Sequence, residues 1–203
     1  MKRIAVLYAT REGHTALVAE CAARRLRDFG IDVEVTNLRT TRSEVRLEDY
    51  DAAVLAASVH VGKHEPEIVK FVRQHRTQLE AMPTAFLSVS LSQAGVEMPQ
   101  ATPEQRARAA AGVQEVLDSF YAETGWQPTL VKAVAGALLY TKYNFITRFI
   151  LKQISKKAGG STDTSRDHVY TDWTALEAFI SSWAETFVSA RRPAGAFFDN
   201  SQK

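Results

Sequence analysis

The chain has 203 residues, of which 45% are hydrophobic and 24% charged, which suits one well-buried core and a single domain rather than two. The first apolar run is only as long as a strand, and no stretch reaches the roughly 20 apolar residues of a spanning helix, so we expect neither a signal sequence nor a transmembrane segment. The single cysteine, Cys21, excludes an internal disulfide and favours a reducing cytoplasm, and the net charge of +2 gives no reason to expect a nucleic-acid partner. We expect one domain over residues 1–189 and a flexible C-terminal tail over residues 190–203.

The first strand and the turn after it are the most informative stretch. Residues 4–9 are almost wholly apolar, which predicts a strand buried on both faces, and an apolar pattern of helical spacing runs over residues 13–29. The start of such a helix is an anion site, because its first N–H groups have no partner and the helix dipole adds partial positive charge. The hydroxyls of Thr10 and Thr15 and the permissive backbone of Gly13 suit a phosphate held without a metal.

The motif T-x-x-G-x-T in this turn is short. A plain helix N-terminus with a threonine cap and a turn glycine is an equally good interpretation of the motif alone, but its place directly after a buried first strand favours the phosphate site. The strings G-x-x-x-x-G-K-[ST] and G-x-G-x-x-G do not occur in the sequence. This argues against a nucleotide triphosphatase and against a Rossmann dinucleotide site.

The elements that follow alternate between strands and helices. Polar loops are expected over residues 58–64 and 91–103, the second being long and without periodicity. Further strands are predicted at residues 31–38, 51–58, 84–90 and 130–135, and further helices from Pro66, Glu104 and Asp172.

The alternation predicts an α/β fold with a parallel sheet of five strands in the order 2-1-3-4-5 and helices on both faces. In that order the carboxyl ends of the first and third strands flank a topological switch point, where open α/β sheets bind ligands. The loops at residues 10–15, 58–64 and 88–93 should therefore converge on one cleft.

Several longer strings carry a resemblance to a known family. Besides the Thr10–Thr15 turn, the chain contains Gly159-Gly160-x-Thr162-Asp163-Thr164 followed by Tyr170-Thr171-Asp172-Trp173. These strings resemble the flavodoxin-like, quinone-dependent protoporphyrinogen IX dehydrogenases of bacterial haem synthesis, and the resemblance runs from about residue 3 to about residue 188. It implies a flavodoxin-like fold, bound FMN, and oxidation of protoporphyrinogen IX to protoporphyrin IX with electrons passed to a membrane quinone.

The resemblance also implies which residues bind the cofactor. Those that would hold the FMN phosphate are Thr10, Arg11, Gly13, His14 and Thr15. Those that would flank the isoalloxazine are Ser58, Val59, His60, Val61, Gly62, Ser88, Ser90, Leu91 and Ser92. No metal site is predicted.

His60 is the candidate catalytic residue, because hydride transfer to a flavin needs an acceptor for the accompanying proton and a histidine pKa lies near neutral pH. The plainer interpretation is that His60 lines the flavin edge or faces solvent, since nothing in the sequence determines its direction. Arg11, His14 and Lys63 are candidates for pairing with phosphate or with the substrate's propionates.

The segment Tyr140–Lys157 combines five positive charges and no acid with an apolar stripe at helical spacing. Such a segment suits contact with the inner face of the cell membrane, where a quinone would be reached, and equally suits a helix packed on its own sheet with a solvated basic face. The sequence leaves the choice between these, and between monomer and homo-oligomer, open.

Two other flavoprotein functions remain as alternatives. The first is an electron-carrier flavodoxin, but such carriers are usually strongly acidic, whereas this chain has a net charge of +2. The second is an FMN-dependent quinone reductase that uses a nicotinamide, but the sequence has no motif for a nicotinamide site. One fold hosts many functions, so the fold alone does not separate them.

Overall fold

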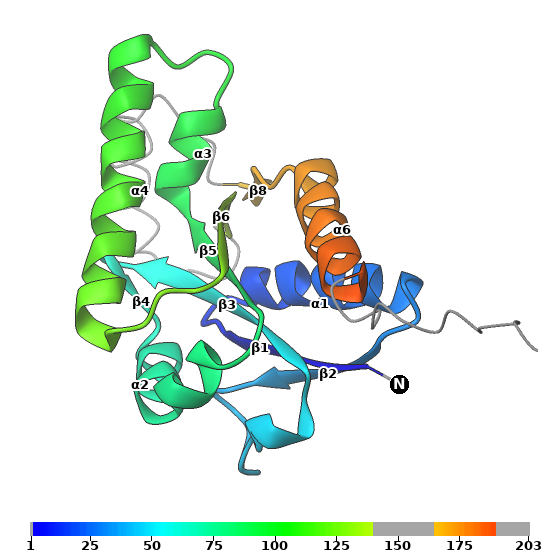
Figure 1. Ribbon diagram of the computed structural model, residues 1–203. Helices are drawn as coiled ribbons and strands as arrows, with labels where there is room; N and C mark the ends of the chain where they lie inside the picture. Colours follow the sequence, from blue (N-terminus) through cyan, green and yellow to red (C-terminus); the bar gives the residue numbers. More distant parts are fainter. Residues whose placement is uncertain (1, 140–164, 190–203) are drawn as a thin grey trace, which may run out of the picture.

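A computed structural model of the protein describes residues 2–139 and 165–189. The predicted tail over residues 190–203, the basic segment Tyr140–Lys157 and the Gly159–Thr164 string lie outside the described residues. In the described part a central sheet carries helices on both of its faces, as Figure 1 shows.

Five parallel strands form the main sheet in the order β2-β1-β3-β5-β6. Their bounds are Arg3–Ala9 for β1, Asp32–Asn37 for β2, Ala52–His60 for β3, Thr84–Ser90 for β5 and Leu130–Ala135 for β6. The register places Ile4 beside Val33 on one side and beside Ala52 on the other. The central strands are near-continuous apolar runs because helices cover both faces, whereas β2 alternates because it lies at the edge. The predicted fold and strand order are confirmed.

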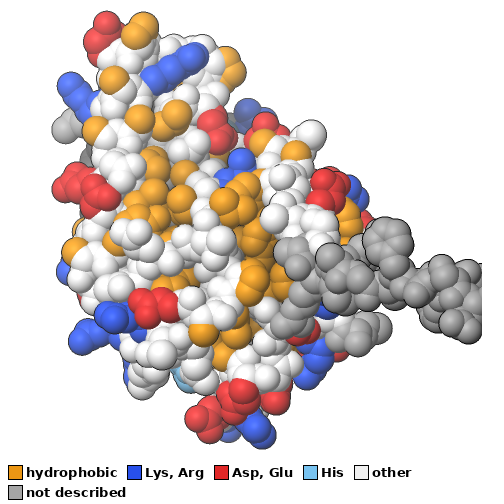
Figure 2. Space-filling view, viewed as in Figure 1, with side chains coloured by type: hydrophobic (Ala, Val, Ile, Leu, Met, Phe, Trp, Pro, Cys, Tyr) orange, Lys and Arg blue, Asp and Glu red, His pale blue; other side chains and the backbone are white. Residues whose placement is uncertain are grey.

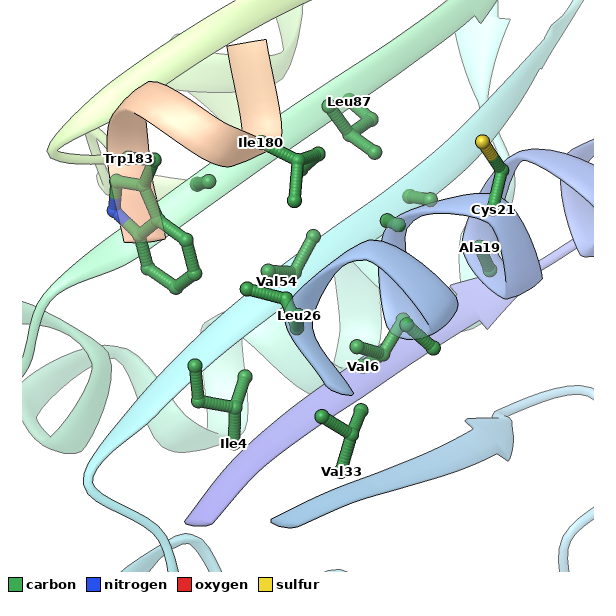
Figure 3. Close-up of a cluster of buried hydrophobic side chains, with 14 of the residues drawn as sticks. Ile4, Val6, Ala19, Cys21, Leu26, Val33, Val54, Leu87, Ile180 and Trp183 are labelled. Atoms are coloured by element: carbon green, nitrogen blue, oxygen red, sulfur yellow. The ribbon is translucent and has the colours of Figure 1, made fainter. Parts of the chain in front are cut away.

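The helices divide between the two faces. Helices α1 (His14–Asp28) and α6 (Trp173–Ser189) pack on one face, and α2 (Pro66–Glu80) and α4 (Pro103–Thr124) pack on the other. Figure 3 shows the first of these cores, in which Leu26 of α1 and Ile180 and Trp183 of α6 lie over the strand residues Val54 and Leu87. Cys21 belongs to this core and is buried, where a free cysteine packs as a small apolar side chain.

The expected loop at residues 58–64 is instead a hairpin. Strand β3 continues through His60 and pairs antiparallel with β4 (Lys63–His64), with Val59 opposite His64. The turn residues Val61 and Gly62 have φ values of 49° and 73°. Two successive residues with positive φ suit the tight turns that join antiparallel strands, and a valine is an unusual residue there, so the sequence did not reveal the turn.

The expected loop at residues 91–103 begins with a short helix, α3 (Leu91–Glu97). Ser90 caps it, since its hydroxyl accepts from the Gln93 N–H at 3.1 Å. Seven residues are too few for a helical period to be recognised, and the helix packs through small side chains on α4, where a Cβ at Gly95 would lie 3.1 Å from Ala109 Cβ.

The remaining short elements are a 3₁₀ turn at Leu47–Asp49 and the two-stranded pair β7 (Ala137–Leu138) and β8 (His168–Val169). Figure 2 shows one side of the molecule, with hydrophobic side chains gathered over its middle and most charged side chains near the margin. Helices of the described ranges are all too short or too polar to cross a bilayer.

Candidate functional site

A pocket of about 520 Å³ lies at the carboxyl ends of the parallel strands. Four segments line it: the turn after β1, the β3–β4 hairpin, the end of β5 with the start of α3, and the residues after β6. Its lining residues are Thr10, Glu12, His14, Thr15, Ser58, Val59, His60, Val61, Gly62, Val89, Ser90, Leu91, Ser92, Gly136, Ala137 and Leu139. We call this the edge pocket. The three loops predicted to converge on one cleft do meet here.

The turn after β1 leaves the start of α1 open. Thr10 Oγ1 accepts from the Gly13 N–H at 3.0 Å, which shapes the turn, and Gly13 has a φ of 97° that a residue with a side chain would adopt only under strain. Gly13 is the N-cap residue and no side chain caps the helix; its first turn also contains no acid. Free N–H groups and the uncompensated end of the helix dipole therefore face this part of the molecule.

Two buried polar atoms in the same turn have no hydrogen-bond partner in the described structure, Thr15 Oγ1 and His14 Nδ1. Their residues are only 1% and 6% exposed, and both line the edge pocket. A buried polar atom without a partner costs free energy, so these two atoms mark a place where a bound ligand can supply hydrogen bonds.

A fixed hydrogen-bond chain determines the orientation of His14. The Thr171 hydroxyl donates to the Ala135 carbonyl at 2.6 Å, so its single proton is used, and its oxygen accepts from His14 Nε2 at 2.7 Å. In the neutral ring Nδ1 is then the bare nitrogen. Burial lowers the His14 pKa, and an anion bound beside it would favour the protonated ring, in which Nδ1 becomes a donor.

Glu65, at the start of α2, is the centre of a buried ionic network. Its side chain has no exposed area and accepts from Arg11 Nε at 2.9 Å and from Ser58 Oγ at 3.0 Å. Arg39 Nη1 lies 3.9 Å from the same carboxylate. The network ties the turn after β1 to the hairpin. Arg11, which was predicted to bind phosphate through its side chain, therefore forms an ion pair with Glu65 instead. Ser58 likewise donates its hydroxyl proton to Glu65.

His60 lies between two carboxylates. Its Nε2 is 2.9 Å from Glu12 Oε2 and 3.2 Å from Glu65 Oε1, at ion-pair distance without the alignment of a hydrogen bond. The carboxylate of Glu12, with that of Glu65, raises the pKa of His60 against the opposing effect of burial. Burial is the largest single effect on Glu12 and raises its pKa, but His60, a backbone hydrogen bond and the charge of Arg11 together lower it below its ordinary value.

The β5 residues divide between two directions. Ser88 Oγ lies 2.8 Å from Nε2 of the buried His64, on the face covered by α2 and α4, and Ser88 does not line the edge pocket. Burial lowers the His64 pKa to about 4. Ser90, Leu91 and Ser92 do line the edge pocket. Of the predicted cofactor residues, Arg11, Gly13 and Ser88 are the ones outside its lining.

The residues after β6 were missing from the predicted site, as were Glu12 and Val89. Gly136 is the clearest of these, because a Cβ there would meet the Ser90 backbone carbonyl carbon and oxygen at 3.4 Å. The Gly136 N–H also donates to that carbonyl oxygen at 2.9 Å. A glycine directly after a strand was the available signal of this close backbone approach.

The chain is similar to known proteins over most of its length. The family profile described as "Flavodoxin domain" matches residues 5–165. The chain is 36% identical over 180 residues to "Protoporphyrinogen IX dehydrogenase [quinone]" of Leishmania major, a match that covers 88% of this chain and 73% of that protein. A protein of the same name from Escherichia coli strain K12 is 35% identical over 174 residues, or 86% of this chain and 90% of that protein.

The chain belongs to the protoporphyrinogen IX dehydrogenase [quinone] family. The resemblance inferred from the sequence is thereby confirmed, and the flavodoxin domain implies a flavin cofactor. The residues that line the edge pocket, from Thr10 to Leu139, all fall within the matched residues 5–165.

Proposed function

We propose that this protein is an FMN-dependent protoporphyrinogen IX dehydrogenase, which oxidises protoporphyrinogen IX to protoporphyrin IX and passes the electrons to a membrane quinone. The observation that carries the proposal is the pair of buried, unpartnered atoms Thr15 Oγ1 and His14 Nδ1 at an uncapped helix start in the edge pocket. The names of the two relatives support the reaction and the acceptor.

The residues of the edge pocket fit FMN. Its phosphate would be held by the N–H groups at the start of α1, by the Thr15 hydroxyl and by His14, with Thr10 and Gly13 shaping the turn. Arg11 would contribute through the backbone of the turn and its positive charge. The apolar residues Val59, Val61, Leu91 and Leu139, with Gly62, Ser90 and Ser92 beside them, would enclose the ring.

When bound, the flavin supplies the electron acceptor for the substrate, and the chain supplies position and electrostatics. Our candidate for the proton that leaves the substrate remains His60. Because its Nε2 faces Glu12 and Glu65, the neutral ring keeps its proton on Nε2, and Nδ1 is the atom that would take up a second proton. The two carboxylates would stabilise the imidazolium that forms.

Peripheral contact of Tyr140–Lys157 with the inner face of the membrane stays a prediction, because the segment lies outside the described residues. A homo-oligomeric state also stays a prediction.

The decisive experiment is an anaerobic assay of the FMN-loaded protein with protoporphyrinogen IX, with and without a quinone. Bleaching of the flavin absorption together with rising porphyrin fluorescence, and turnover only with quinone present, is the expected result. If FMN binds but stays oxidised with protoporphyrinogen IX, the protein is an electron carrier or a quinone reductase, and the proposal is wrong.

The variant His60→Gln, assayed beside Thr41→Val at a half-buried residue outside the edge pocket, tests the proton acceptor. We expect a loss of about 10²-fold or more in the flavin reduction rate for His60→Gln at unchanged FMN affinity, which is the usual scale of acid–base catalysis. An unchanged reduction rate would show that His60 only lines the flavin edge.

A further inference from the structure

A second hollow, of about 790 Å³, lies beside the β3–β4 hairpin. His60 lines both this hollow and the edge pocket, whereas Val61 and Gly62 belong to the edge pocket and Lys63 to the second hollow. The hairpin is therefore the wall that the two share. The wall opposite the hairpin comes from α2, through Val69, Lys70, Arg73 and Gln74, so we call the hollow the α2 pocket.

Three cations of the α2 pocket have no partner among the described residues. Lys63, Lys70 and Arg73 are exposed and make no hydrogen bond or ion pair there. Lys70 and Arg73 are three positions apart on α2, so they lie on the same side of that helix. Arginines nearby are used differently: Arg11 pairs with Glu65, and Arg76 pairs with Glu80 at 3.2 Å.

The acids of this pocket do not balance these charges. Glu65 is fully buried and already contacts Arg11, Ser58 and His60. Glu123, exposed at the end of α4, is the other acid among the described lining residues. The lining thus keeps an excess of positive charge inside a concave surface, where charges of one sign attract an oppositely charged ligand most strongly.

We propose that the α2 pocket binds the carboxylate groups of the tetrapyrrole substrate while the ring reaches the edge pocket across the hairpin. The inference rests on the proposed function. Protoporphyrinogen IX is an apolar ring that carries two propionate groups, so it needs an apolar surface beside a basic one. Val61, fully exposed at the hairpin turn, and Leu91 supply the first, and Lys63, Lys70 and Arg73 supply the second.

Binding of protoporphyrin IX to the FMN-loaded protein, followed by porphyrin fluorescence, tests the proposal without relying on turnover. The double variant Lys70→Gln/Arg73→Gln should bind the diacid about three- to tenfold more weakly, as expected for the loss of two exposed ion pairs. Affinity for protoporphyrin IX dimethyl ester, which has no carboxylate, should not change. Added salt should weaken wild-type binding of the diacid and leave binding of the ester unchanged.

The matched control is Arg76→Gln/Arg108→Gln, which also removes two positive charges, one from α2 and one from α4, both outside the pocket lining. It should bind the diacid as the wild type does, and every variant should bind FMN with unchanged affinity. Equal loss of diacid and ester affinity in the Lys70/Arg73 variant, or no loss at all, would overturn the carboxylate site.

The outcomes separate this inference from the proposed function. Turnover of protoporphyrinogen IX without the expected binding pattern would refute the site and keep the reaction. The expected pattern without turnover would refute the reaction and keep a site for porphyrin carboxylates. Wild-type protein that binds neither the diacid nor the ester and shows no turnover of protoporphyrinogen IX would refute both.

Discussion

His60 pairs with Lys63 and His64 pairs with Val59 in one tight hairpin, yet the surroundings of the two histidines shift their pKa values in opposite directions. His60 lies between the carboxylates of Glu12 and Glu65, which raise its pKa. His64 packs against Phe86 and Phe120, and burial lowers its pKa to about 4. One short hairpin therefore carries a histidine that gains a proton easily and another that resists it.

His64 should make the protein sensitive to acid. Its pKa is lower in the folded chain, about 4, than the ordinary 6.5, so its contribution to stability is present above pH 6.5 and is lost as the pH falls toward 4. A shift of this size corresponds to about 3 kcal/mol in the free energy of unfolding. An NMR titration of the ring should show His64 still neutral near pH 5. A midpoint near 6.5 would contradict this environment.

His60 should show the opposite dependence. Its folded pKa is raised, so its contribution to stability is fully present below the ordinary value of 6.5 and is lost as the pH rises through the folded value. Urea unfolding of the wild type and of His60→Gln should differ most near pH 6 and converge at about pH 9. A difference that grows with pH would exclude the ion pair with Glu12.

Thr15→Val should separate cofactor binding from stability. The Thr15 hydroxyl is buried without a partner in the described structure, so its removal should leave the free energy of unfolding of the apoprotein unchanged or slightly higher. FMN binding should weaken by about 1 to 3 kcal/mol, because one buried contact to the phosphate is lost.

Thr171→Val is the contrasting variant, since the Thr171 hydroxyl is already bonded to both His14 and Ala135. It should destabilise the apoprotein by about 1 to 3 kcal/mol. FMN titration and urea unfolding of both variants check the pair. Unchanged FMN affinity in Thr15→Val would rule out this turn as the phosphate site.

Val61→Asn should stabilise the protein. Val61 is fully exposed and has a φ of 49°, so the valine contributes no packing while its branched side chain is strained. Asparagine tolerates this conformation, and we expect a gain of about 0.5 to 1 kcal/mol, measured as a higher Tm. Val169→Asn, at an exposed residue of β8 with negative φ, is the control and should give no gain. A fall in Tm for Val61→Asn would show that the valine packs on something.

The order of the sheet and the place of the pocket could be predicted from the pattern of residues alone. Buried apolar runs at residues 4–9, 51–58 and 84–90 allowed only central strands, because a strand covered by helices on both faces has no polar side. The turn Thr10–Thr15 could also be recognised from the sequence, because a glycine and two hydroxyls between a buried strand and a helix are local features.

Which side chains face the pocket could not be predicted, because it depends on the packing of the folded chain. Arg11 and Ser58 are turned toward Glu65, and Ser88 is turned toward His64, through contacts between different elements of the fold. The alternation of side chains along a strand shows which face of the sheet a residue lies on, but not which side chain it contacts. At the carboxyl ends of the strands this alternation stops. Burial without a partner, which singles out Thr15 and His14, is likewise a property of the packed chain.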